Sequence, residues 1–310
     1  MTKPARFDIE RRSNLSYEEF AREYLYPLKP VIVTDVMQQW RALERWGPEF
    51  FKQQFGQVTF SYYGADYNED LYEKKTGKEF TLAELIDQVM ESTPDRPAPY
   101  LRNKILSDIF PSLIPDIQPL PQYLFPNWLA ESYLVKHLQR NLNRGAAIEL
   151  FIGGAGSTFP ILHYDGYGTH AFLMQLYGQK EYIVYPPEQE QFLYPMPERM
   201  NLSRVCVNRP DLENFPLFQD AVPTTFVLKP GEMLFVPSHW WHTVRIVTPS
   251  ITLAANVLNQ SNWHELMQFM THKLHNPVAI LALQTYLTCA GKWRAWRDRQ
   301  WNQRVFHRAA

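Results

Sequence analysis

Cysteine is scarce in this chain of 310 residues, which contains only Cys206 and Cys289. Two cysteines exclude a disulfide framework, and their wide separation excludes a CxxC zinc-binding motif. An excess of charge of one sign is also lacking, because 31 Lys and Arg residues are balanced by 32 Asp and Glu residues. The resulting net charge of -1 argues against a generally basic nucleic-acid-binding protein, although a local basic surface stays open.

Long hydrophobic runs are missing as well. The longest apolar stretch, Val278 to Ala290, is interrupted by polar residues and is shorter than the ~20 residues that a membrane span requires. The first residues, MTKPARFDIERR, lack the apolar core of a signal peptide. These features predict a soluble intracellular protein, cytoplasmic or, in a eukaryote, nuclear.

Aromatic residues and prolines are abundant. Aromatics make up 15% of the chain, and there are 24 prolines. Together they favour a strand-rich fold with long structured loops over a helical bundle.

The first part of the chain, residues 1–145, is expected to be a mixed α/β segment. Ser16 with Glu19, and Thr81 with Glu84, form capping-box patterns that predict helix starts. Between these two patterns, VIVTDV predicts a short strand and WGPEFFKQQFG a helix.

The pattern changes near residue 146, where four strand-like stretches begin: AAIELFIGG, HAFLMQLYGQKEYIVYPP, TTFVLKPGEMLFVPSHWWHTVRIV and SITLAANVL. A Pro- and Asn-rich segment at 186–223 interrupts them, and it is expected to be functional or to contain short elements. We therefore predict a β-rich core at residues 146–259.

Residues 260–310 are predicted to form a helical extension. Trp263, Met267, Met270 and Leu274 recur at helical spacing. Such an apolar stripe must be buried, either on the core or across a twofold homodimer interface, and we favour the homodimer. The Trp- and Arg-rich tail also suits nucleic acid, but an amphipathic helix is the more common explanation.

The most informative local motif is His163-Tyr164-Asp165. Residues two apart on a strand share a face, so His163 and Asp165 would present an imidazole and a carboxylate together. His242 lies in PSHWWHTV, on or next to another strand of the same region. Two histidines and one carboxylate form a facial triad that suits Fe(II), although a lone strand histidine is more often an ordinary polar residue.

Two further polar residues stand inside apolar strands. Lys180 follows FLMQLYGQ and precedes EYIVY, and a buried lysine requires a partner anion. Asn256, within ITLAANVL, also requires a partner.

These stretches, taken in order, carry a family resemblance. GSTFPILHYD, GQKEYIVYPP, NRPDLENFP, LKPGEMLFVPSHWWHTV and ITLAANVL resemble the JmjC (cupin-like) family of Fe(II)- and 2-oxoglutarate-dependent oxygenases. The similarity covers roughly residues 20–260 and is greatest to the small hydroxylase branch, which includes the asparaginyl hydroxylase of hypoxia-inducible factor. It implies a mainly β fold with helices. The core would be a double-stranded β-helix, or jelly-roll (cupin) barrel, flanked by the N-terminal α/β segment and the C-terminal helices.

The resemblance also assigns site residues. It implies that His163, Asp165 and His242 hold Fe(II) and that Lys180 pairs with the distal carboxylate of 2-oxoglutarate. Its remaining co-substrate contacts are Tyr100, Asn256, Thr158 and His170. The last two are departures, because Pro160 stands where the family has Ser or Thr and the chain is slightly longer around Gly166–His170. His239, three residues before His242, is expected to be a non-ligand.

The implied activity is O2-dependent hydroxylation of a C–H bond, most readily on a protein side chain. N-methyl-lysine demethylation and RNA modification are alternatives within the family. A non-catalytic cupin-like binding module is an alternative of another class, which the complete triad disfavours. A cupin that uses another metal would require more histidines and a glutamate in one motif, and HYDGYGTH lacks that glutamate.

Overall fold

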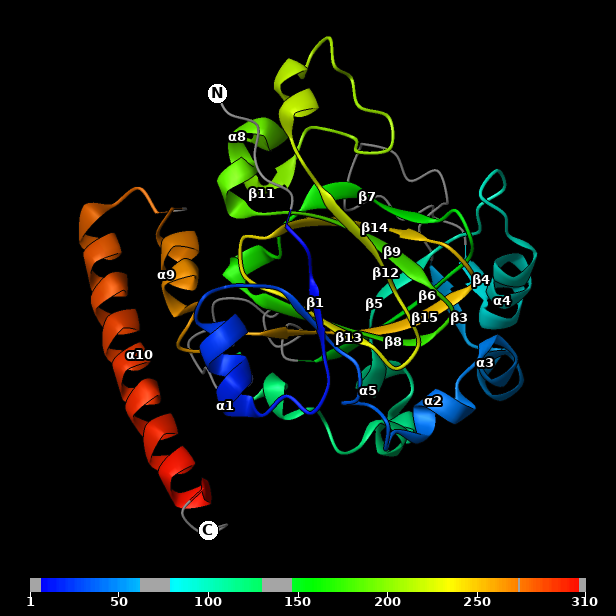
Figure 1. Cartoon of the computed structure of the whole chain (residues 1–310), viewed down its shortest axis with the longest axis horizontal. Helices are drawn as coiled ribbons and strands as arrows, with labels where there is room; N and C mark the ends of the chain where they lie inside the picture. Colours follow the sequence, from blue (N-terminus) through cyan, green and yellow to red (C-terminus); the bar gives the residue numbers. More distant parts are fainter. Residues whose placement is uncertain (1–6, 62–78, 130–146, 273, 307–310) are drawn as a thin grey trace.

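The computed structural model describes residues 7–61, 79–129, 147–272 and 274–306, and two facing β-sheets form its centre (Figure 1). The larger sheet has the strand order β1-β2-β13-β8-β15-β6-β5 and the smaller one β10-β11-β7-β14-β9-β12. A separate pair, β3 (Thr59–Ser61) and β4 (Glu79–Thr81), lies outside both sheets.

Eight strands of these sheets form a jelly roll. Four belong to the larger sheet: β6 (Ile148–Gly153), β8 (His170–Tyr177), β13 (Met233–Val236) and β15 (Ser250–Val257). Four belong to the smaller sheet: β7 (Thr158–His163), β9 (Lys180–Tyr185), β12 (Thr224–Leu228) and β14 (Trp241–Ile246). Neighbours within each set run antiparallel. The predicted cupin fold, mainly β with flanking helices, is therefore confirmed.

The N-terminal segment also extends the larger sheet at both edges. On one side β1 (Glu10–Arg12) pairs in parallel with β2 (Val31–Val33), which pairs with β13. On the other side β5 (Leu101–Ile105) pairs with β6. The division near residue 145 consequently falls within a continuous sheet.

Helices of this segment cover the outer side of the larger sheet. Both predicted capping boxes are present, at Ser16 before α1 and at Thr81 before α4. The helical elements are α1 (Tyr17–Phe20), η1 (Ala21–Leu25), α2 (Arg41–Arg45), α3 (Pro48–Phe55), α4 (Leu82–Glu91), α5 (Leu106–Ile109), η2 (Pro111–Ile117) and η3 (Gln122–Leu124).

The alternation of side chains along β8 separates the hydrophobic core from the barrel interior. Phe172 and Met174 pack with Phe20 of α1 in the core, whereas Ala171 and Leu173 line the interior cavity. Because successive strand residues point to opposite faces, one strand serves both purposes.

The segment at 186–223 contains short elements, as predicted. They are η5 (Pro187–Gln189), α8 (Glu190–Leu193), β10 (Pro195–Met196), β11 (Arg199–Ser203) and η6 (Pro216–Asp220). Its strand β11 pairs with β7, placing Leu202 opposite His163. The segment thus borders the predicted metal site.

Two helices follow β15. Helix α9 (Trp263–His272) lies between the barrel and the long helix α10 (Pro277–Phe306), as Figure 1 shows. Trp263 and Leu266 are buried, and the Trp263 indole donates a hydrogen bond to the Leu287 carbonyl of α10. Across the described ranges, the helices are all too short or too polar to span a bilayer.

Candidate metal and co-substrate site

The strand pairing of β7 with β14 brings two histidines together. His163 ends β7, and in the antiparallel register it lies directly opposite His242 of β14. Their ring centroids are 4.4 Å apart. Two side chains that are distant in the sequence therefore share one face of the sheet because the strands are hydrogen-bonded neighbours.

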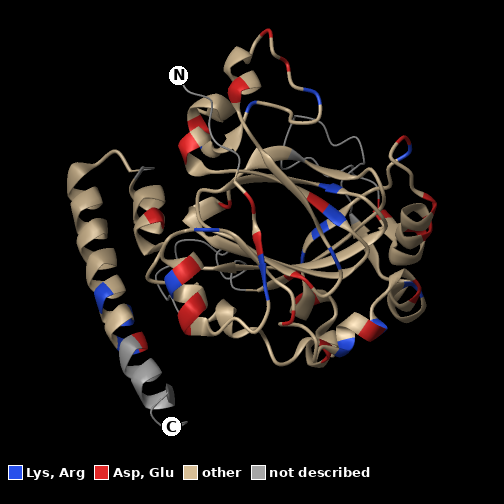
Figure 2. Ribbon diagram, viewed as in Figure 1, with Lys and Arg blue, Asp and Glu red and all other residues tan. Residues whose placement is uncertain are grey.

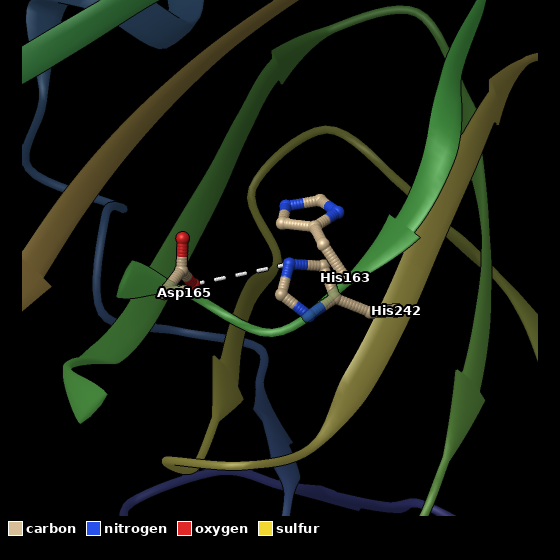
Figure 3. Close-up of side chains that lie close together, drawn as sticks. All are labelled: His163, Asp165 and His242. Atoms are coloured by element: carbon tan, nitrogen blue, oxygen red, sulfur yellow. Dashed lines mark ion pairs between the residues drawn. The ribbon is translucent and has the colours of Figure 1, made fainter. Parts of the chain in front are cut away.

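Asp165 completes the cluster from the loop after β7 (Figure 3). Potential ligand atoms of His163, Asp165 and His242 all lie within 4.8 Å of one another. The Nε2 atom of His242 is 3.8 Å from a carboxylate oxygen of Asp165. Spacings of this size suit three ligands around one ion, so the structure brings the predicted triad together.

Backbone carbonyls orient both imidazoles. The Nδ1 atom of His163 is 2.9 Å from the Ile161 carbonyl, and that of His242 is 3.0 Å from the Trp240 carbonyl. A carbonyl only accepts, so each Nδ1 carries a proton, and in the neutral ring Nε2 is then the atom with the lone pair. This is the tautomer that a histidine needs to bind a metal through Nε2.

Burial sets the protonation tendencies of two of these residues. It holds the pKa of His163 well below the usual value, with repulsion from His242 in support. It also raises the pKa of Asp165, an effect that His242 partly opposes. A neutral imidazole is the form that a metal ion requires.

Lys180 lies at the other end of the cavity. It is the first residue of β9, and its Nζ atom donates a hydrogen bond of 3.0 Å to the Tyr100 hydroxyl. Both side chains are only 3% exposed, and within the part of the chain that the structure describes no carboxylate pairs with Lys180. Burial lowers the pKa of Lys180 to about 7 and raises that of Tyr100. A buried ammonium without a counterion is a site for an anion.

The two ends face one cavity of about 930 Å³. On β9, Lys180 and Val184 point the same way, and Val184 is the register partner of His242. The ends are thus four residues, roughly 13 Å of strand, apart. A small dicarboxylate fits this arrangement, with further space for part of a substrate.

The other predicted contacts differ in their placement. Asn256 lines the cavity from β15, whereas Thr158 and His170 are not among the lining residues. Thr158 starts β7, opposite Arg245 and at the far end of the strand from His163. His170 has its ring nitrogens bonded to Ser238 and Ser261, and its neighbour Thr169 lines the cavity instead. The expectation that His170 faces the co-substrate is corrected by the alternation along β8.

His239 stands outside the triad, as expected, but it is not remote. Its Nε2 atom is 2.6 Å from the Glu265 carboxylate, and its ring stacks on Tyr164 at 4.5 Å. All three residues line the cavity. No sequence pattern pointed to Glu265, because only tertiary packing brings α9 to the barrel opening. Tyr182, by contrast, was detectable, since it shares a strand face with Lys180.

Comparisons with known proteins agree with this geometry. A family model described as a cupin-like domain matches residues 17–268. The chain is 30% identical over 257 residues to the lysine-specific demethylase JMJ30 of Arabidopsis thaliana, a match that covers 79% of this chain and 54% of that protein. It is 29% identical over 247 residues to the lysine-specific demethylase 8 of Xenopus tropicalis, covering 77% and 50%.

A shorter match involves the HSPB1-associated protein 1 of Homo sapiens, which is 38% identical over 126 residues, or 39% of this chain and 24% of that protein. The chain spans about half the length of the two demethylases that it matches. The narrower resemblance to an asparaginyl hydroxylase stays a prediction.

Proposed function

The chain belongs to the cupin-like domain family, and from that premise we propose that it is an Fe(II)- and 2-oxoglutarate-dependent oxygenase. The observation that supports this most directly is the pairing of two sites in one cavity. A His-Asp-His cluster lies at one end, and at the other lies a buried lysine that has no carboxylate partner among the described residues.

The ligand set fits a ferrous ion. Two imidazoles and one carboxylate leave coordination positions open, which a metal that binds co-substrate and O2 requires. A structural zinc site would have four ligands, usually with sulfur. Both cysteines lie outside the cavity lining.

The lysine end fits the distal carboxylate of 2-oxoglutarate. The Lys180 ammonium and the Tyr100 hydroxyl would each donate a hydrogen bond to it. Since Lys180 already donates to the Tyr100 oxygen, the phenol proton is available for another acceptor. Asn256 is positioned on the cavity wall to bind the same molecule.

When bound, Fe(II) and 2-oxoglutarate supply the oxidising power for hydroxylation of a C–H bond by O2, with succinate and carbon dioxide as co-products. The protein's own contribution is geometry and exclusion of water. His163, Asp165 and His242 would hold the metal, and Lys180 would orient the co-substrate. Apolar lining residues such as Phe151, Leu173 and Val244 keep the interior dry.

For the substrate, a protein side chain is proposed. The two longest matches described above are to proteins named lysine-specific demethylases, which makes N-methyl-lysine the first class to test. Hydroxylation of a side chain that carries no methyl group is the second. Both begin with the same C–H hydroxylation, because a hydroxylated N-methyl group loses formaldehyde.

The test measures conversion of 2-oxoglutarate to succinate with added Fe(II), first alone and then with methyl-lysine peptides or cell protein. Mass spectrometry separates the outcomes. Demethylation removes one methylene unit, whereas stable hydroxylation adds one oxygen atom. Full succinate production by His163→Ala would refute the proposed function.

Self-association through α10 is proposed as well. Figure 2 shows that the first half of this helix carries no charge, and it exposes Val278 (76%) and Leu281 (66%). Another face of α10 packs on α9 through Leu287 and Ala295. Trp263, Met267 and Met270 of the stripe predicted for a homodimer interface pack within the chain instead. A second copy would therefore cover this free face of α10, by a twofold contact. A monomeric mass at micromolar concentration would remove this proposal.

A further inference from the structure

A chain of buried hydrogen bonds starts in the loop before β14. The backbone N–H of Ser238 donates to the Nδ1 atom of His170, at 2.9 Å. The other ring nitrogen, Nε2, lies 2.7 Å from the Ser261 hydroxyl. Because Nδ1 accepts, Nε2 carries the proton and donates it to Ser261. His170 therefore joins the loop before β14 to the turn after β15.

The chain continues through two asparagines. The Ser261 hydroxyl donates to the Asn259 side chain at 2.7 Å, and the Asn259 backbone N–H donates to the Asn262 side chain at 2.8 Å. The Asn262 amide nitrogen then donates to the Gly168 carbonyl, at 2.9 Å, and to the Val257 carbonyl, at 3.0 Å. Gly168 ends the short η4 turn (Gly166–Gly168), which begins directly after Asp165.

Burial makes this chain specific. His170 and Asn262 are fully buried, Ser238 and Asn259 are nearly so, and Ser261 between them is half-buried. In such surroundings a broken hydrogen bond leaves a polar group unsatisfied, so the alternatives to this arrangement are unfavourable. The hydrogen bonds of the chain join the loop before β14, the turn after β15 and the turn after Asp165, and so fix the relative position of these segments.

The two ends of the chain lie next to metal ligands. Ser238 precedes His242 by four residues, and Gly168 follows Asp165 by three. His163 and His242 need no such support, because they lie within β7 and β14, which pair directly with each other. Asp165 lies outside the strand, and strand pairing does not hold it.

A second contact joins the same segments. Glu265 of α9 binds His239 in the loop before β14, at 2.6 Å. Glu265 also packs closely on Gly168, which has a positive φ of +64°. A Cβ atom added to Gly168 would lie 2.2 Å from the Glu265 Cβ atom, so any other residue at this position would clash. The residues that follow the barrel thus touch both the turn after Asp165 and the loop before β14.

We propose that the His170–Ser261–Asn259–Asn262 chain is a positioning device that holds the turn after Asp165 against the loop before β14, so that Asp165 meets the two strand-borne histidines before a metal ion binds. The inference rests on the metal site of the proposed function. If it holds, the residues after β15 help to build the metal site, because the barrel strands alone do not position Asp165.

The test compares His170→Phe with the wild-type protein by titration with Co(II), followed by the visible absorption of the bound ion. Loss of a group that hydrogen-bonds directly to a metal ligand typically weakens metal binding by roughly 10–100-fold, and because His170 acts through further residues, an effect of about tenfold or less is expected here. We expect an increase of that size in the Co(II) Kd, together with a changed absorption spectrum. His170→Asn, which restores an acceptor near the Nδ1 position, should recover part of the loss.

Gln189→Leu is the matched control. Gln189 is also buried and bonds the Val222 backbone through both amide atoms, but it lies outside the cavity lining. It should lower the Tm of the metal-free protein and leave the Co(II) Kd and spectrum unchanged. If His170→Phe does not fold, Ser261→Ala decides, because it removes only the hydroxyl that links His170 to Asn259.

The experiment distinguishes failure of the positioning role from failure of the proposed metal site. A folded variant with wild-type Co(II) affinity and spectrum overturns the positioning role and leaves the proposed function intact. A wild-type protein that binds no Co(II) overturns the metal site, and the positioning role falls with it.

Discussion

The two ends of the cavity are built from strands of the same barrel, but they hold their polar groups in different ways. At the metal end, cross-strand register places two imidazoles side by side, and backbone carbonyls fix their tautomers. At the other end, a single ammonium is buried against a phenol and aromatic rings. At the metal end, hydrogen bonds within the protein already orient the side chains. At the lysine end, the buried ammonium still needs an anion to balance its charge. The difference indicates that one end selects a cation and the other a carboxylate.

The largest effect should come from removing the only charged ligand of the metal end. Asp165→Ala is expected to lower 2-oxoglutarate turnover on the order of 10³-fold, beyond the ~10–100-fold typical of residues outside the ligand shell. Stopped assays of succinate formation measure the loss of turnover, and Co(II) titration measures the loss of metal affinity. His275→Ala, at an exposed histidine, serves as the control. Turnover within a few-fold of wild type in Asp165→Ala would contradict this account of the metal end.

Lys180→Met should separate binding from stability at the other end. A charge-assisted hydrogen bond contributes about 1.5–3 kcal/mol, so the affinity for 2-oxoglutarate should fall roughly 10–100-fold. The Tm of the protein without co-substrate should rise, because a buried ammonium without a counterion is replaced by an apolar chain of similar length. Anaerobic calorimetry and thermal unfolding measure both. A lower Tm together with unchanged 2-oxoglutarate affinity would mean that Lys180 stabilises the fold and does not bind the co-substrate.

The pH dependence of co-substrate binding should also distinguish the two ends. The pKa of Lys180 is lowered to about 7 in the free protein, and a bound carboxylate would raise it. Affinity should therefore be constant below pH 7 and fall with rising pH above it, by about tenfold per unit at most. Unfolded lysine keeps its proton to higher pH, so over the same range the free protein gains stability as pH rises. Calorimetry of 2-oxoglutarate binding from pH 6 to 9 measures the first effect. Lys180→Met should remove the slope, and a slope that persists in this variant would assign it elsewhere.

The smallest predicted effect belongs to the phenol. Tyr100→Phe removes one hydrogen bond of about 1 kcal/mol, so co-substrate affinity should fall about fivefold with metal affinity unchanged. Tyr185→Phe is the control, because Tyr185 is buried but does not line the cavity. An equal loss in both variants would indicate a general packing effect and not a contact with the co-substrate.

Much of the fold was predictable because its signals are local. The capping boxes at Ser16 and Thr81 and the strand-like stretches after residue 146 depend on neighbouring residues, and each appears where it was expected. The edge strands β1 and β5 were not predicted, because their short sequences become strands only by pairing with β2 and β6.

The candidate site divides in the same way. His163 and Asp165 formed a visible motif, and Lys180 stood out as a charge within an apolar strand. His170 was misplaced because the phase of side-chain alternation depends on where β8 begins, and the sequence did not fix that residue. Glu265 and Phe269 reach the cavity from a helix that the sequence left free to pack elsewhere.

By itself, the sequence determined which chemical groups the cavity contains, because residue identity and strand periodicity are local properties. It also determined that a buried lysine would need an anion. Only the tertiary structure decided that His242 lies opposite His163, that Tyr100 accepts a hydrogen bond from Lys180, and that Glu265 contacts both the turn after Asp165 and the loop before β14. Those relations join residues far apart in the chain, and their distances are set by strand register and packing, which no local pattern specifies.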